Sequence, residues 1–239
     1  MTTAARDAFL YALPLVEIAN TRATMLGRGL PSGHFLSLKG LATPKDRFVT
    51  TPNADTIYAN AFIDLRHGPA TLTLPSLGDR YGSLALMDMF SDHIAVLGSR
   101  TTGQHGGTFT LVGPEGPAPA GAIRATTPWV WALARVVVNG PEDVAAARDV
   151  LAGFACEAAP RGDWAPGADR NGPWQDWLAA AHALMLENPA PATDRRMLEN
   201  IAPLGLGHAD FDPARFTTAQ AEEIAAGIAE GRALSKAAG

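Results

Sequence analysis

The chain has 239 residues, a formal net charge of −5 and 47% hydrophobic residues. This apolar content is enough for a sizeable core. The charge excludes the dense basic surface that neutralises the phosphates of a nucleic acid, because the basic residues are scattered and Arg195-Arg196 is their one adjacent pair. We therefore expect a soluble protein that does not bind nucleic acid.

The first apolar stretch, residues 8–16, is too short to span a bilayer and is interrupted by Pro14. No basic segment with a small-residue cleavage site accompanies it, so we expect no membrane association and a cytoplasmic location. The single cysteine, Cys156, excludes an intrachain disulfide and fits a reducing compartment. We interpret it as a small core residue on a helix.

The periodicity of apolar residues predicts the elements in chain order. Phe9, Leu13 and Val16 recur at helical spacing and predict a helix over residues 4–25, with a kink or interruption at Pro14. An extended loop follows over residues 34–53. Alternating apolar residues then predict strands over residues 58–65, 70–74, 82–89, 93–97, 108–112 and 128–138.

These strands follow one another through turns, without the long crossovers that parallel pairing needs, so we expect antiparallel pairing in a sandwich or open barrel. Helices are predicted after Gly140. They begin at Pro141, at Trp174, near Asp194 and at a Thr217-x-x-Gln220 capping box. The predicted fold class is α+β. We expect an N-terminal helix and β core over residues 1–140, and a helical region over residues 141–239 packed on it as one compact unit.

The strong catalytic and cofactor motifs are absent from the sequence. It has no phosphate loop, dinucleotide fingerprint, His-Glu-x-x-His, Cys-x-x-Cys or Gly-x-Ser-x-Gly motif. The six histidines are dispersed without metal-ligand spacing. The sequence therefore predicts no metal site and no cofactor.

Polar residues gather around the first strand, in Thr-Thr-Pro-Asn-Ala-Asp-Thr-Ile-Tyr over residues 50–58. Asn53 and Asp55 fit a structural role, because their side chains can cap backbone N–H groups in a turn before the strand. They also fit a pocket at the mouth of the sheet. There Asp55 would act as general base or ligand carboxylate, and Tyr58 as a hydroxyl donor.

Arg80 and Arg100 each fit two roles. One is a buried ion pair, for which Asp55, Asp88 and Asp92 are the candidate partners. The other is bidentate binding of a substrate carboxylate or phosphate. Because Asp88 lies in an apolar strand, it must be paired or have a raised pKa, which makes it a structural anchor or a catalytic acid.

His105 lies in the glycine-rich loop over residues 103–107. This position suits a general acid or base, and it equally suits an exposed histidine without a function. Trp129 and Trp131 share one face of a strand, where they would line an aromatic wall or pack in the core.

Several stretches of the sequence resemble a known family. They are YALPLVEIANTR, VTTPNADTIYANAFIDL, DRYGSLALMDMFSDHIAVLGSRTTG, FTLVGP and ENPAPATDRRMLENIAPLGLG. They are similar to the bacterial family called domain of unknown function 1254, whose longer members often carry a partner module, domain of unknown function 1214. The resemblance implies a β-rich fold with helical additions, and homo-oligomerisation. It implies no particular reaction, and we expect this chain to lack the partner module.

Two hypotheses follow. The first is a domain that binds an anionic or polyhydroxy small molecule. Such a domain either binds the molecule alone or also acts on it as a metal-independent enzyme. Its candidate catalytic residues are Asp55, Tyr58 and His105, and its candidate substrate-binding residues are Asn53, Arg80, Asp88 and Arg100. The second is a non-catalytic structural or assembly module, in which the same side chains fix turns and subunit contacts.

Overall fold

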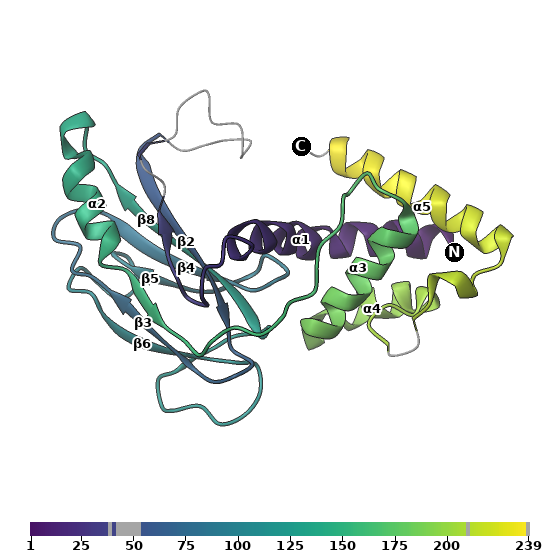
Figure 1. Ribbon diagram of the computed structural model, residues 1–239, viewed down its shortest axis with the longest axis horizontal. Helices are drawn as coiled ribbons and strands as arrows, with labels where there is room; N and C mark the ends of the chain where they lie inside the picture. Colours follow the sequence, from purple (N-terminus) through teal and green to yellow (C-terminus); the bar gives the residue numbers. More distant parts are fainter. Residues whose placement is uncertain (38–39, 42–53, 209–210, 238–239) are drawn as a thin grey trace. The chain divides into compact units, whose positions relative to one another are not determined.

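The computed structural model describes residues 1–37, 40–41, 54–208 and 211–237. The chain divides into two compact units, which Figure 1 shows in one view. The helical unit consists of Met1–Arg28, Met89–Ser91 and Asp163–Gly239. The β unit consists of Gly29–Asp88 and Asp92–Gly162.

The larger sheet of the β unit, sheet A, has five strands in the order β1-β2-β8-β4-β5. Their bounds are Leu36–Ser37 for β1, Thr56–Asp64 for β2, Trp129–Val137 for β8, Gly82–Met87 for β4 and His93–Gly98 for β5. β8 is central, because it pairs with β2 from Thr56↔Val137 to Asp64↔Trp129 and with β4 on its other side.

The smaller sheet, sheet B, has four strands in the order β7-β6-β3-β9. Their bounds are Ile123–Arg124 for β7, Gly107–Val112 for β6, Ala70–Leu74 for β3 and Ala155–Glu157 for β9. The ladders of both sheets are antiparallel, apart from a short parallel pairing of β6 with β7.

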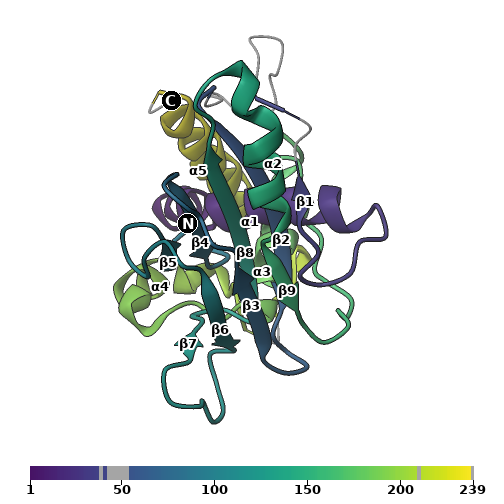
Figure 2. The same cartoon turned by 90° about the vertical axis from the view of Figure 1, so that its left-hand side faces the viewer.

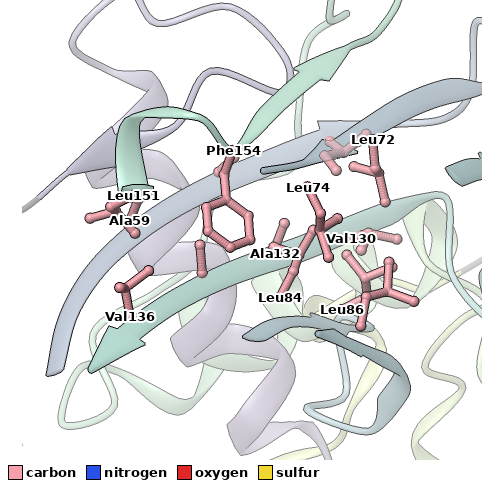
Figure 3. Close-up of a cluster of buried hydrophobic side chains, with 14 of the residues drawn as sticks. Ala59, Leu72, Leu74, Leu84, Leu86, Val130, Ala132, Val136, Leu151 and Phe154 are labelled. Carbon is pink, nitrogen blue, oxygen red and sulfur yellow. The ribbon is translucent and has the colours of Figure 1, made fainter. Parts of the chain in front are cut away.

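One hydrophobic core joins the two sheets, because alternate residues of each strand point to the same side. Figure 3 shows Leu84, Val130 and Ala132 of sheet A close to Leu72 and Leu74 of sheet B. A 3-10 turn at Pro141–Asp143 leads into helix α2, Val144–Ala152, which packs against β8 and β2 (Figure 2). Its buried Leu151, together with Phe154 just beyond its end, completes the core.

The predicted fold class is confirmed. The six predicted strands are present with bounds that agree within two residues, and both sheets are open, as in a sandwich. One prediction was wrong: Cys156 lies in β9 opposite Leu72 and not on a helix, because α2 ends at Ala152 with Gly153 as its C-cap. It still packs against the core, and burial, followed by the charge of Glu157, raises the pKa of its thiol to about 12.

The helical unit contains four α-helices within the described residues. They are α1 (Thr2–Leu26), α3 (Trp174–Glu187), α4 (Arg195–Ile201) and α5 (Thr218–Ala237), with 3-10 turns at Ala192–Asp194, Ala202–Leu204 and Pro213–Arg215. Helix α1 continues through Pro14 without the interruption that the sequence allowed. The predicted capping box is confirmed: the Thr217 amide donates to Gln220 Oε1 at 2.9 Å, and the Gln220 amide donates to Thr217 Oγ1 at 3.3 Å.

Helices α1 and α5 approach closely because two glycines of α5 face α1. A Cβ atom on Gly231 would come within 2.9 Å of the Phe9 ring, and one on Gly227 within 2.9 Å of the Ala5 side chain. Both glycines are buried in the described structure. Small residues at this spacing let two helix backbones come together along one stripe.

A buried ion pair links α1 to the end of α3. The Arg22 guanidinium lies 2.7 Å from the Glu187 carboxylate, and their side chains are 0% and 7% exposed. Arg22 also donates to the Ala165 carbonyl at 2.9 Å, while the Ala165 amide and the Asn188 side chain donate to Glu187. The pair joins two of the family-like stretches recognised in the sequence.

No helix in the described part of the chain combines the length and the apolar character that crossing a membrane requires.

We predict that Glu187→Gln lowers the free energy of unfolding by about 3–5 kcal/mol, because it leaves the Arg22 charge buried without a counter-charge. Glu199→Gln is the matched control, since Arg195 and Glu199 form an Arg–Glu pair with side chains 85% and 62% exposed. The control substitution should lower the free energy of unfolding by less than about 1 kcal/mol. Urea unfolding of both variants measures the difference, and equal losses would contradict the assignment.

Candidate functional site

One end of sheet A brings together residues that are far apart in the sequence. Because neighbouring strands run antiparallel, the starts of β2 and β4 lie beside the ends of β8 and β5. The Val138 amide donates to the Asp55 carbonyl at 2.9 Å, and the Val137 amide donates to the Tyr81 carbonyl at 3.0 Å. Asp55, Arg80 and Arg100 therefore belong to the same end of the sheet.

Arg80 forms a bidentate ion pair at this end, and its partner is Asp143. Nη1 and Nη2 donate to the two carboxylate oxygens at 2.6 and 2.8 Å, and Nη1 also donates to the Val137 carbonyl at 2.9 Å. The sequence suggested Asp55, Asp88 or Asp92 as the partner; the actual acid is the residue directly before α2. The hydrogen bond from Arg80, supported by the Asn139 amide, lowers the pKa of Asp143 to about 2.

A pocket of about 480 Å³ opens beside this ion pair. We call it the Arg80 pocket. Its lining comes from the loop before β4, from the end of β8 and from α2, namely Ser76, Leu77, Gly78, Asp79, Arg80, Asn139 and Val150. Ser76, Asp79 and Asn139 are exposed to solvent, so the pocket presents a hydroxyl, a carboxylate and an amide from one side of the β unit.

The loop that carries His105 lies next to this pocket. The Leu77 amide donates to the Gln104 carbonyl at 2.8 Å, and Ser99 contacts the Gln104 side chain at 3.1 Å. His105 itself is exposed and does not line the pocket. Arg100 is also exposed, with its guanidinium 5.2 Å from the centre of the Tyr81 ring.

Asp88 lies at the opposite end of sheet A. It follows β4 whereas Arg80 precedes it, so the six-residue strand places roughly 20 Å between them. Its carboxylate is fully buried and accepts hydrogen bonds from Thr126 Oγ1 at 2.6 Å and from the Asp92 amide at 2.9 Å. The bond from Asp92 fixes the turn between β4 and β5, and the bond from Thr126 joins this turn to the segment before β8. Asp88 does not line the Arg80 pocket.

Tyr58 occupies the face of sheet A that points away from the core. Its neighbours in the strand, Ile57 and Ala59, belong to the core, and the Arg135 guanidinium lies 5.6 Å from the centre of its ring. On the same face Trp131 donates to Asn60 Oδ1 at 3.0 Å. Tyr58 does not line the Arg80 pocket. Asn53 lies outside the described residues.

A second buried carboxylate, Asp64, was not singled out from the sequence. It is fully buried and binds Arg66 with both oxygens, at 2.8 and 2.7 Å, while the Gly162 amide donates to it at 3.0 Å. Burial raises the pKa of Asp64, but the hydrogen bonds from Arg66 and Gly162 outweigh this and hold it below the ordinary value. Its role is to fix the end of β2.

The residues that sequence reasoning missed are Ser76, Asp79, Asn139 and Asp143. Asp143 lies at the start of the helix that the sequence predicts from Pro141. No local pattern indicates that it meets Arg80, because the pairing depends on the closure of β8 against β4. Among the described residues there is no group of three or more His, Cys, Asp or Glu side chains that could hold a metal ion.

The fold and this site define an α+β protein with an open pocket at the end of an antiparallel sheet. The family model described as "Protein of unknown function (DUF1254)" matches residues 32–158, which is just over half of the chain and nearly all of the β unit. The chain belongs to this family. A search of the curated proteins finds no match to this chain.

Two solved structures are similar to this chain. The VPA0106 protein from Vibrio parahaemolyticus has a TM-score of 0.74 and 20% sequence identity, over 96% of this chain and 57% of that one. This likeness shows the fold alone, and this chain spans 57% of the length of the Vibrio protein. An uncharacterised protein from Burkholderia cenocepacia has a TM-score of 0.37 and 17% identity, over 74% of this chain and 46% of that one.

We predict that Asp143→Asn removes a part of the acid dependence of stability. Because the folded-state pKa is about 2, below the ordinary value of 3.8, the ion pair stabilises the protein above pH 4 and is lost as the pH falls towards 2. The wild type should therefore unfold at a higher temperature than the variant at pH 6, and this gap should shrink between pH 4 and 2.

Thermal unfolding followed by circular dichroism across this range measures the gap. Asp149→Asn, an exposed acid on α2, is the control and should follow the wild type. A gap for Asp143→Asn that stays constant down to pH 2 would contradict the prediction.

Proposed function

We propose that the β unit binds a small polyhydroxylated molecule in the Arg80 pocket. The observation that supports this most is the polar lining, because Ser76, Asp79 and Asn139, which carry a hydroxyl, a carboxylate and an amide, line one volume of about 480 Å³. Pockets for small molecules are concave and carry a few polar groups that fix the ligand. Hydroxyl groups of a ligand both donate and accept, so they match all three side chains.

The charge of the pocket favours a polyhydroxy ligand over an anionic one. Both Nη atoms of Arg80 already donate to Asp143, so the ion pair is neutral as a whole. Asp79 then leaves the lining with one negative charge. An anion would gain little attraction from Arg80, whose charge Asp143 already neutralises, and it would be repelled by Asp79. A neutral polyol does not meet this repulsion.

We assign binding and no reaction to this pocket. Its described lining holds one carboxylate, Asp79, and no imidazole, whereas proton transfer in both directions usually needs a second titratable group. Asp55 and His105 are the candidates to supply one, because both lie near this end of the sheet. Turnover would require the His105 loop to move towards the pocket on ligand binding.

The second candidate function is that of a structural or assembly module. It is favoured by the buried carboxylates Asp64 and Asp88, which are engaged inside the protein and lie away from the pocket. Under this proposal the chain forms homo-oligomers and binds no small molecule specifically. Sedimentation velocity at several protein concentrations, with and without polyols, distinguishes the two candidates.

We predict that monosaccharides or inositol bind the wild type, and that succinate, citrate and inorganic phosphate do not. Asn139→Ala should weaken polyol binding about fivefold, because it removes one hydrogen bond to the ligand. Asn139 is exposed, so its replacement should leave the unfolding temperature almost unchanged. Isothermal titration calorimetry on the full chain measures both affinities.

Asn171→Ala is the matched control, since Asn171 is an exposed asparagine of the helical unit, and it should bind like the wild type. Equal weakening in both variants would place the binding elsewhere. Binding of the anions alone would contradict the charge argument, and the absence of any binding would favour the assembly module.

A further inference from the structure

The helical unit has a second pocket with a different chemistry. It has a volume of about 580 Å³ and lies between the start of α3, the 3-10 turn at Pro213–Arg215 and the start of α5. Trp174 and Phe216 provide its aromatic surface, and Gln175, Asp212 and Thr218 provide its polar groups. We call it the Trp174 pocket. It belongs entirely to the helical unit and shares no residue with the Arg80 pocket.

Two aromatic rings form adjacent walls of this pocket. The ring centres of Trp174 and Phe216 are 6.2 Å apart, and their planes are inclined by 60°. Both side chains are half-buried, so each ring keeps a part of its surface open. The face of an aromatic ring carries negative potential, so a pocket wall that contains two rings attracts positive charge.

The charge of the residues that line the pocket also favours a positively charged ligand. Asp212 is the one charged residue among those that line the pocket. Its Oδ1 accepts a hydrogen bond from the Ala214 amide at 2.8 Å, which orients the carboxylate. One of the two rings already has a cation beside it, since the Arg215 guanidinium lies 5.1 Å from the centre of the Phe216 ring.

We propose that the Trp174 pocket binds an alkylated ammonium group. A metal ion would need several oxygen ligands, and Asp212 is the one carboxylate in the lining. A primary ammonium is compact and strongly hydrated, so it loses more hydration against aromatic walls than an alkylated ammonium does. An alkylated ammonium is large, weakly hydrated and apolar at its surface, so aromatic walls with one carboxylate satisfy it.

The test uses choline as the probe and its carbon isostere, in which a tert-butyl group replaces the trimethylammonium group, as the matched ligand. Titration of the full chain by ligand-observed NMR and calorimetry measures both affinities. We expect choline to bind at least about fivefold more tightly than the isostere, because the two differ in charge and hardly in shape. Equal affinities would show an apolar pocket without cation recognition and would overturn the proposal.

Three variants locate the binding. Trp174→Leu keeps an apolar wall and removes one ring, and Asp212→Asn removes the charge but keeps an oxygen for the Ala214 amide. Each should abolish the preference for choline over the isostere. Asp176→Asn, an exposed acid of α3 that does not line the pocket, should keep the preference.

Circular dichroism checks the fold of each variant, and Asp212→Asn alone decides the question if Trp174→Leu does not fold. A preference that survives in Asp212→Asn and Trp174→Leu, or the absence of choline binding to the wild type, overturns the proposal.

Discussion

A charge that is withdrawn from water needs a partner, and this constraint organises both units. In the helical unit it ties α1 to the end of α3 through Arg22 and Glu187. In the β unit it fixes the end of β2 through Asp64 and Arg66, and it ties sheet A to the start of α2 through Arg80 and Asp143. These pairs set where the elements end and which charges stay available to a ligand.

Asp143 neutralises the charge of Arg80, and this changes which ligands the Arg80 pocket favours. An arginine in a cleft usually indicates an anionic ligand. Here both Nη atoms of Arg80 already donate to the Asp143 carboxylate, so the pair adds no net charge to the pocket. Asp79 then determines the sign of the pocket. The Trp174 pocket is lined by one acid and two aromatic rings, so each unit has a pocket whose described lining contains a carboxylate that no lining cation neutralises.

The strands and most helices could be predicted from the sequence, because alternation and turn residues act over a few neighbours. The short strand β9 could not, since Ala155–Glu157 has no pattern of its own and is a strand because β3 offers it a free edge. The site was harder. Asp55, Arg80 and Arg100 do share one end of the sheet, but Asp88 lies at the other end, Tyr58 faces away from the core, and Asp143 meets Arg80 only through strand pairing.

The packing of α1 on α5 has a consequence for synthesis. The buried face of α1, with Ala5 and Phe9, finds Gly227 and Gly231 some two hundred residues later in the chain. At a translation rate of about 5–20 residues per second, tens of seconds pass between the synthesis of this apolar face and the synthesis of the α5 residues that cover it. The interval between the synthesis of Arg22 and that of its partner Glu187 is nearly as long. The face of α1 that packs on α5 is thus covered only long after the residues of α1 have been made.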